Sequence, residues 1–349
     1  MRMLLLLLLM TPVSAIAEAA FPTAKVDAMM KNHAGDAPGA SVLVLRDGVP
    51  VLRKAYGLAD RERRIAATPA TNYRLASVTK QFTAAAILLL VEEGRMTLDD
   101  NVRRWLPSLP ASADAINVRH LLTHSSGLID YEDVMPSDFS GQLHDADVLH
   151  LLESQDRTYF PPGTGYRYSN SGYALLALMV ERVSGQSFAD FLRSRIFQPL
   201  GMAHTLAFVE GGSAIADRAY GYSESSGVWI RTDQSTTSAV LGDGGIYSSI
   251  DDLTKWDAAL YDDRLLNERS RRLMFTPHVV TDDPDIRYGF GWRITGETLW
   301  HSGESIGFRN VIVRYPQRRL TVIVLSNRDD PEPYATAKAI AELAIGQGR

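Results

Sequence analysis

The sequence contains no cysteine, which excludes disulfides, thiolate metal sites, a cysteine nucleophile and a lipid-modified N-terminal cysteine. Any nucleophile in this chain must therefore be an oxygen or an amine. The chain also lacks a block of basic residues, and its 36 Lys and Arg are outnumbered by 41 Asp and Glu, for a net charge of -5. A mildly acidic chain without a basic face is not suited to nucleic acid or to acidic lipid surfaces, so neither is an expected partner.

The apolar run near the N-terminus, residues 3–10, is too short to span a bilayer, which needs about 20 residues. It follows Arg2, breaks at Thr11-Pro12 and leads into small residues, which is the layout of a secretory signal peptide over residues 1–17. We expect cleavage after Ala17, export to the periplasm or the medium, and a mature chain of residues 18–349 with no stable membrane span. The alternative is an N-terminal anchor helix.

Strand patterns lie near both ends of the chain. Ala40–Arg46 and residues 49–57 flank Asp47-Gly48, a dipeptide that favours a tight antiparallel hairpin. Strand patterns return at residues 288–295, 298–301, 308–315 and 320–326, before an Ala-rich helix from about 334 to 345.

The middle of the chain, from about 95 to 275, is predicted to be helices and loops with little strand. Helices are expected at residues 118–123, 145–153, 173–183, 188–197 and 250–260. An α+β fold follows, in which an antiparallel sheet flanked by helices (about 20–76 and 280–349) carries an inserted all-helical region (about 77–279).

Ser77 and Lys80 open a helix, predicted over residues 77–93, that is apolar on nearly all sides. Their spacing of three places both side chains on one helix face, within reach of each other. The chain has six lysines against 30 arginines, so a lysine in an apolar helix indicates a task that requires loss of a proton. The structural alternative is a serine cap beside a lysine that extends to solvent.

Tyr168 and Asn170 stand two residues apart, in a turn-rich segment that leads into a helix. A phenol and a carboxamide placed in this way can point into one cleft, where the phenol moves a proton and the amide holds a substrate carbonyl or orients a lysine. Taken alone, the pair is also compatible with a turn closed by an aromatic side chain.

The stretch His301-Ser302-Gly303 ends a predicted strand. A strand that carries a cation, a hydroxyl and then no side chain could line a cleft with its edge and pair with substrate backbone. A structural histidine is the alternative.

Three other patterns compete with these candidates. Residues 303–307 match the G-x-S-x-G nucleophile elbow, with Ser305 as nucleophile, but a strand follows in place of a helix and no histidine occurs after His301. His120 and His124 have a helical metal spacing but lack the glutamate of zinc peptidases and a third ligand, which favours a structural helix end. Residues 242–245 are predicted to form a flexible turn near the cleft, because the features of a phosphate loop are missing.

Together, the segments Ser77-Val78-Thr79-Lys80, Tyr168-Ser169-Asn170 and His301-Ser302-Gly303 resemble the serine β-lactamase and D-alanyl-D-alanine carboxypeptidase superfamily in order and spacing. Further stretches resemble the group of class C β-lactamases, low-molecular-weight DD-peptidases and related esterases, namely residues 73–76, 120–128, 244–249 and 288–292. The resemblance covers about residues 37–326.

The resemblance implies a β-lactamase/transpeptidase-like fold with the active site between the sheet and the helical region. It implies that Ser77 is the acylating nucleophile, that Lys80 and Tyr168 transfer protons, and that Asn170 positions the substrate amide and Lys80. The backbone N–H groups of Ser77 and Glu304 would form an oxyanion hole. No metal and no organic cofactor is implied.

The third motif departs from the Lys-Thr-Gly of many β-lactamases, because His301 replaces the lysine. A histidine is mostly neutral at pH 7, so the anchor for a substrate carboxylate is weaker, although Ser302 still offers a hydroxyl. The expected function is an exported serine hydrolase acting on D-amino-acid peptides, β-lactam-like amides or small esters, with cell-wall peptides and β-lactams as candidate ligands. The alternatives are a catalytically silent binder of cell-wall peptides or penicillin, and an α/β-hydrolase that uses Ser305.

Overall fold

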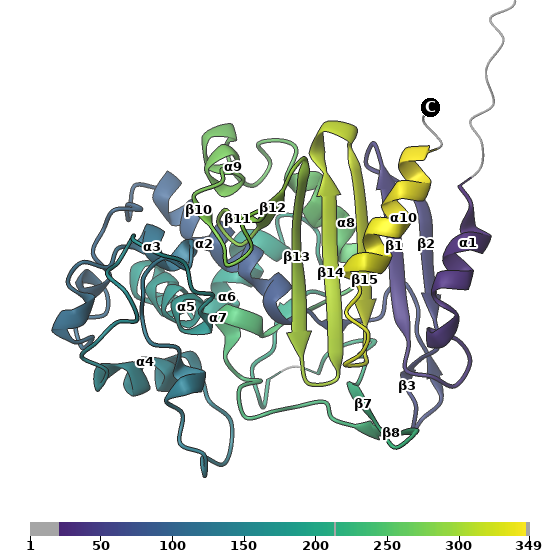
Figure 1. The fold of residues 1–349 in the computed structure, drawn as a ribbon, viewed down its shortest axis with the longest axis horizontal. Helices are drawn as coiled ribbons and strands as arrows, with labels where there is room; N and C mark the ends of the chain where they lie inside the picture. Colours follow the sequence, from purple (N-terminus) through teal and green to yellow (C-terminus); the bar gives the residue numbers. More distant parts are fainter. Residues whose placement is uncertain (1–20, 213, 347–349) are drawn as a thin grey trace, which may run out of the picture.

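The computed structural model describes residues 21–212 and 214–346, and its largest element is an eight-stranded antiparallel sheet (Figure 1). The strand order is β10-β11-β12-β13-β14-β15-β1-β2. The bounds are β1 Ala40–Arg46, β2 Val49–Tyr56, β10 Val279–Val280, β11 Arg287–Tyr288, β12 Arg293–Thr295, β13 Thr298–Ser305, β14 Phe308–Tyr315 and β15 Leu320–Ser326. The two ends of the chain therefore build one sheet, as the sequence predicted.

The junction between the two ends is the pairing of β1 with β15, in which Ala40 lies opposite Ser326. The predicted hairpin of β1 and β2 is confirmed, and its turn residues Asp47 and Gly48 have φ angles of 52° and 77°. Positive φ at both central positions matches the right-handed twist of the flanking strands.

Both faces of the central strands are covered, which explains why these strands are apolar without alternation. In β1, Val42 and Val44 belong to a cluster with α1 (Thr23–Met29) and α10 (Tyr334–Gly346), whereas Leu43 and Leu45 belong to the larger core on the other face. Figure 1 shows α10 and α1 on one side of the sheet and α8 (Ile250–Ala259) on the other.

The predicted strand over residues 288–295 is wrong in its continuity, because β11 and β12 are separated by a turn. Gly291 in this turn has a φ of 75°, and a Cβ there would lie 2.6 Å from the carbonyl oxygen of Lys80. The turn therefore packs directly on the first residue of α2.

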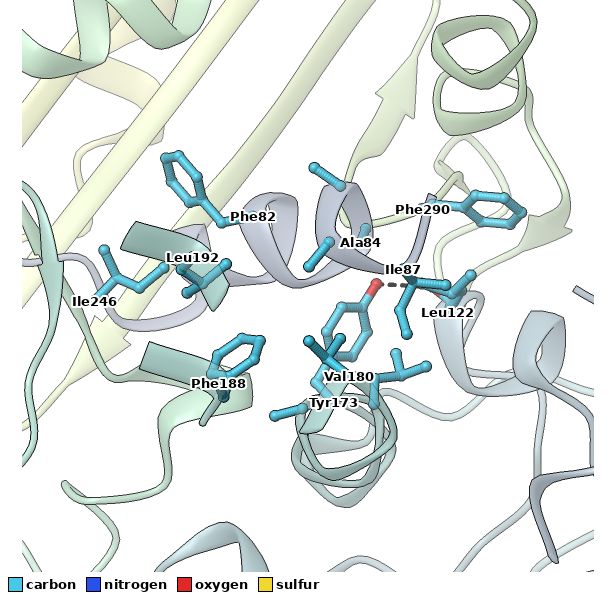
Figure 2. Close-up of a cluster of buried hydrophobic side chains, with 14 of the residues drawn as sticks. Phe82, Ala84, Ile87, Leu122, Tyr173, Val180, Phe188, Leu192, Ile246 and Phe290 are labelled. Carbon is cyan, nitrogen blue, oxygen red and sulfur yellow. Dashed lines mark hydrogen bonds between the residues drawn. The ribbon is translucent and has the colours of Figure 1, made fainter. Parts of the chain in front are cut away.

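The helical part of the molecule surrounds α2 (Lys80–Glu92), whose residues from Lys80 to Leu90 are all buried. In Figure 2, Tyr173 of α5 rises toward α2, and its hydroxyl donates to the carbonyl of Leu122 at 2.8 Å. The other α-helices of this part are α3 Val118–Leu122, α4 Asp145–Glu153, α5 Asn170–Ser184, α6 Phe188–Leu192, α7 Leu241–Gly244 and α9 Glu268–Met274. Helix α6 continues as a π-helical turn at Arg193–Phe197. Short 3-10 turns lie at Lys31–His33, Ala76–Thr79, Val102–Arg104, Ala111–Ala113, Tyr131–Asp133 and Pro316–Arg318.

Two expectations for the middle of the chain need correction. Short strands lie among the helices of this middle region. Strand β9 (Ile246–Ser248) pairs with β6 (Leu206–Ala207) and with β5 (Tyr73–Arg74), which precedes the region, and β7 (Tyr222–Ser225) pairs with β8 (Val228–Arg231). Nearer the N-terminus, β3 (Leu58–Asp60) pairs with β4 (Ile65–Ala66). Residues 242–245 are not a flexible turn, because three of them belong to the buried helix α7 and Gly242 packs against α5.

The predicted signal peptide, residues 1–17, lies outside the described residues. Within residues 21–212 and 214–346, every helix is too short or too polar to cross a membrane.

Candidate active site

Ser77 lies in the 3-10 turn η2 (Ala76–Thr79), which runs directly into α2. The residue before it, Ala76, has a φ of 48°, in the left-handed region that costs a non-glycine residue on the order of 1 kcal/mol. Leu75, one residue further back, donates its backbone N–H to the carbonyl of Ile246 at 2.8 Å. This hydrogen bond attaches the strained turn to β9. Ser77 itself is half-buried.

The Lys80 ammonium lies beneath Ser77 and has no solvent exposure. Its Nζ donates to Ser77 Oγ at 3.1 Å, to Asn170 Oδ1 at 2.8 Å and to the carbonyl of Asp243 at 3.0 Å. A buried cation is tolerated only when polar groups replace its water, and these three acceptors do so. They also fix Nζ within hydrogen-bond reach of the serine hydroxyl.

Asn170 is the first residue of α5, and its place is set by the start of that helix. Ser169 caps the helix by accepting the N–H of Gly172, and the Asp130 carboxylate accepts the N–H of Asn170 at 2.7 Å. The Asn170 side chain then bridges two groups, because Oδ1 accepts from Lys80 and Nδ2 donates to Glu132 Oε1 at 3.0 Å.

The ring of Tyr168 also lies near Lys80, with its centre 4.8 Å from Nζ. The ring packs against His124 at a centroid distance of 4.3 Å, and the Nδ1 atom of His124 accepts the N–H of Ser169. Burial, together with the Lys80 and Arg293 charges, holds the pKa of His124 well below its usual range. A neutral imidazole therefore supports the tyrosine and the turn that carries it.

Strand β13 brings the third motif against η2. A Cβ on Gly303 would lie 2.1 Å from the carbonyl oxygen of Leu75, so only glycine allows this approach. The close packing places the next residue, Glu304, beside Ser77 in the wall of one pocket.

His301 is not brought to this pocket. Its side chain is buried, Nε2 lies 2.9 Å from the hydroxyl of Tyr288, and Nδ1 lies 2.6 Å from the carbonyl of Ser302. Burial and the nearby Arg293 charge hold the pKa of His301 well below its usual range. The expectation that the His301 side chain lines the cleft therefore needs correction, because the ring is buried and both of its nitrogens already have protein partners.

The pocket above Ser77 has a volume of about 110 Å³. It combines groups from η2, the start of α5, α7 and the end of β13. Its lining residues are Arg74, Ala76, Ser77, Tyr131, Glu132, Asn170, Ser235, Thr237, Asp243, Gly244, Glu304, Ser305 and Ile306.

Sequence reasoning missed the acidic part of this pocket. Burial raises the pKa of Asp243 to about 7, the negative charges of Asp145 and Glu132 add to the rise, and Lys80 opposes it. The Asp243 side chain accepts the Tyr131 hydroxyl at 3.2 Å. The available signal was the cluster of acids at residues 130–133, directly after the segment 120–128 that supported the family resemblance.

The competing patterns do not form sites of their own. Ser305 ends β13 and is followed by a two-residue turn and then by strand β14, so the helix that a nucleophile elbow requires is absent there. His120 joins the cap of α3, since its Nδ1 lies 3.4 Å from the Asn117 N–H. In the part of the chain that the structure describes, no three His, Cys, Asp or Glu residues gather as metal ligands would.

Comparison with known proteins assigns the chain to a family. The sequence profile of the family described as Beta-lactamase matches residues 23–347. The chain is 33% identical to Penicillin-binding protein 4* of Bacillus subtilis (strain 168) over 328 residues, which are 88% of this chain and 72% of that protein. It is 30% identical to a D-aminopeptidase of Gluconobacter oxydans (strain 621H) over 311 residues, 87% of this chain but only 58% of the relative.

A solved structure gives the same result. The D-amino acid amidase from Ochrobactrum anthropi SV3, complexed with L-phenylalanine amide, superposes with a TM-score of 0.78 at 26% identity, covering 93% of this chain and 97% of that chain. The fold is therefore the β-lactamase/transpeptidase-like fold that the sequence predicted. Because the chain has this fold and matches the family profile over nearly all of its described residues, the protein belongs to the Beta-lactamase family.

Proposed function

We propose that this protein is an exported serine hydrolase that works through an acyl-enzyme on Ser77. One observation carries the proposal: Ser77 Oγ, facing a pocket, lies 3.1 Å from the buried Lys80 Nζ, which Asn170 and the Asp243 carbonyl hold in place. A nucleophile within hydrogen-bond reach of a proton acceptor that is itself oriented by a third group is the arrangement that nucleophilic catalysis requires.

In the proposed reaction, the pair formed by Lys80 and Tyr168 has lost one proton when the substrate binds. Ser77 Oγ attacks the substrate carbonyl carbon, and its proton passes to this pair. The carbon–nitrogen or carbon–oxygen bond then breaks, and the pair returns the proton to the leaving amine or alcohol. Water next attacks the acyl carbon and gives a proton to the same pair, the acid leaves, and Ser77 regains its hydrogen.

Charge on the tetrahedral oxygen would be stabilised by the backbone N–H groups of Ser77 and Glu304. The close packing of Gly303 on η2 supports this role, because it brings the strand that carries Glu304 beside the nucleophile. Asn170 would hold both the substrate amide and Lys80, and Ser302, next to Gly303, would offer its hydroxyl to the substrate. The reaction as proposed requires neither a metal nor an organic cofactor.

The substrates proposed are D-amino-acid peptides, β-lactam-like amides and small esters. Membership of the Beta-lactamase family and the likeness to a D-aminopeptidase and a D-amino acid amidase support amide substrates. Export rests on the signal-peptide pattern of residues 1–17. The alternative is a silent binder of cell-wall peptides or penicillin, which would not need the buried lysine.

Intact mass spectrometry with excess penicillin tests the proposal, with Ser77→Ala as the comparison. We expect an adduct or consumption of the drug in the wild type and neither in the variant. Tryptic cleavage assigns an adduct, because Ser77 lies in the peptide of residues 75–80 and Ser305 in that of residues 294–309. If penicillin remains untouched, the same pair of proteins is assayed with D-alanine p-nitroanilide and p-nitrophenyl acetate.

A persistent adduct on residues 75–80 indicates a penicillin-binding, peptidase-like enzyme, and penicillin consumption without an adduct indicates a β-lactamase. The proposal is wrong if Ser77→Ala retains wild-type turnover, or if the adduct maps to Ser305. Non-covalent binding of penicillin without turnover of any of the three substrates would support the silent binder.

A further inference from the structure

We propose that the Asp243 carboxyl holds the water that hydrolyses the acyl-enzyme, so that this residue acts in deacylation and not in acylation. The inference rests on the proposed function, because it adds a group to the last step of the same reaction. None of the three sequence motifs includes Asp243, which lies in the short helix α7.

Helix α7 fixes the backbone of Asp243 beside the proton-transfer group. The Asp145 carboxylate of α4 accepts the N–H of Gly242 at 2.9 Å, and a Cβ on Gly242 would lie 2.3 Å from the backbone of α5. The carbonyl of Asp243 accepts from Lys80 Nζ at 3.0 Å. The backbone of the residue is thus held from three sides, by α2, α4 and α5.

The two oxygens of the Asp243 carboxyl have different surroundings. Oδ2 accepts the Tyr131 hydroxyl at 3.2 Å, whereas Oδ1 receives no hydrogen bond from the residues that the structure describes. Burial, together with the Asp243 charge, raises the pKa of Tyr131, so the phenol stays protonated and donates to Oδ2. Asp243 is 6% exposed and lines the same pocket as Ser77, which at about 110 Å³ has room for a water beside a small acyl group.

The attacking water needs acceptors for both of its hydrogens, because its lone pair must point at the acyl carbon. One hydrogen is donated to Asp243 Oδ1 and stays on the water oxygen. The other passes as a proton to the pair of Lys80 and Tyr168 while the oxygen bonds to the acyl carbon. The bond from that carbon to Ser77 Oγ then breaks, the acid leaves with the first hydrogen, and the pair returns the proton to Ser77.

The other polar groups of the lining are less suited to orient this water. Asn170 already contacts Lys80 and Glu132 through its amide. Arg74 has two buried guanidinium nitrogens, Nε and Nη1, without partners among the described residues, but these are donors. Donors would bind the lone pairs of the water, which must be free for the attack. Glu132 and Glu304 are acceptors, but they are exposed, so bulk water competes for their oxygens.

The test compares the wild type with Asp243→Asn, using p-nitrophenyl acetate at pH 8. That pH lies above the pKa of about 7 to which burial raises the Asp243 carboxyl. Asparagine keeps the size of the side chain and removes the charge. Decay of the acetyl adduct, followed by intact mass after removal of the ester, should slow about 10- to 100-fold. We expect kcat and KM to fall together, while kcat/KM, which reports acylation, changes less than about twofold.

A second variant tests the same geometry without changing the carboxyl. Tyr131→Phe removes the donor that holds Oδ2, so decay of the adduct should slow about two- to tenfold, the equivalent of one hydrogen bond, again with kcat/KM unchanged. The control Asp263→Asn removes an exposed carboxylate that pairs with Arg271, and it should change neither step.

Two results would overturn the inference. A wild-type rate of deacylation in Asp243→Asn would show that another group holds the water, and equal losses of acylation and deacylation in Asp243→Asn and Tyr131→Phe would restrict both residues to packing. In either case Ser77-dependent ester hydrolysis would leave the proposed function intact, whereas turnover that survives Ser77→Ala would remove the proposed function itself.

Discussion

Gly303 in β13 lies so close to Leu75 that a single added methyl group would sit 2.1 Å from the Leu75 carbonyl oxygen. This contact sets the distance between the strand and the turn that carries Ser77. The glycine of His301-Ser302-Gly303 is therefore required for the packing of β13 on η2.

Gly303→Ala is expected to separate β13 from η2, lower the free energy of unfolding by about 1–3 kcal/mol and reduce turnover at least about tenfold. Urea unfolding and ester hydrolysis measure the two effects. Gly346→Ala, where a Cβ would meet nothing within 4 Å, is the control and should change neither. Normal activity in Gly303→Ala would show that the contact does not position the site.

Lys80→Arg is expected to reduce the rate of acylation by roughly 10²–10⁴, the range associated with general acid–base catalysis. The guanidinium of arginine is larger and permanently protonated, so it does not fit the three acceptors that surround Lys80 Nζ and cannot accept the Ser77 proton. Single-turnover kinetics measure the step. Lys255→Arg, at an exposed lysine paired with Asp252, should have no effect. An acylation rate in Lys80→Arg close to that of the wild type would rule out the proton-transfer role.

The buried ion pair between Arg314 of β14 and Asp257 of α8 predicts a large stability effect. The two groups are 2.6 Å apart, their side chains are 1% and 3% exposed, and Asp257 also accepts the Thr321 hydroxyl at 2.8 Å. Asp257→Asn should lower the free energy of unfolding by about 3–5 kcal/mol, because it leaves a buried guanidinium uncompensated. In urea unfolding, the exposed pair of Arg193 and Asp190 provides the contrast, and Asp190→Asn should cost at most about 1 kcal/mol. Similar losses in both variants would contradict this.

The raised pKa of Asp243, about 7 in the folded protein, predicts a pH dependence of stability. Between about pH 4 and 7 the folded state holds a proton that the unfolded state releases, so the contribution of this group falls as the pH rises through that window. Asp243→Asn removes the titration and should reduce the difference in unfolding free energy between pH 4.5 and pH 7.5. The exposed Asp263→Asn should not change that difference. An unchanged difference in Asp243→Asn would mean that the carboxyl is already ionised at pH 4.5.

The sequence predicted most of the fold because its strongest patterns coincide with buried elements. The segments Ala40–Arg46, Phe308–Tyr315 and Leu320–Ser326 are rich in Val, Ile and Leu, and their observed bounds equal the predicted ones. The break between β11 and β12 was missed because it depends on the carbonyl of Lys80, more than 200 residues earlier in the chain. The two-residue strands were missed because their pairing partners, rather than their own residues, define them.

The site was predictable only where motifs are local. Ser77 and Lys80 are three residues apart, so helix geometry alone brings them together. The position of Glu132 depends on Asp130, which accepts the first N–H of α5, and the burial of His301 depends on Tyr288 of β11, two strands away in the sheet. Such relationships arise from tertiary contacts, and no spacing in the sequence encodes them.

The pairing of β1 with β15 has a consequence for biosynthesis. Ala40 must wait for Ser326 before the large sheet can close, so a nascent chain on the ribosome carries an unfilled sheet edge through most of its synthesis. Closure of such a long loop is intrinsically slow. We therefore expect the sheet to close only after translation has passed the last strand, and the edge of β1 to stay open to pairing with other chains until then.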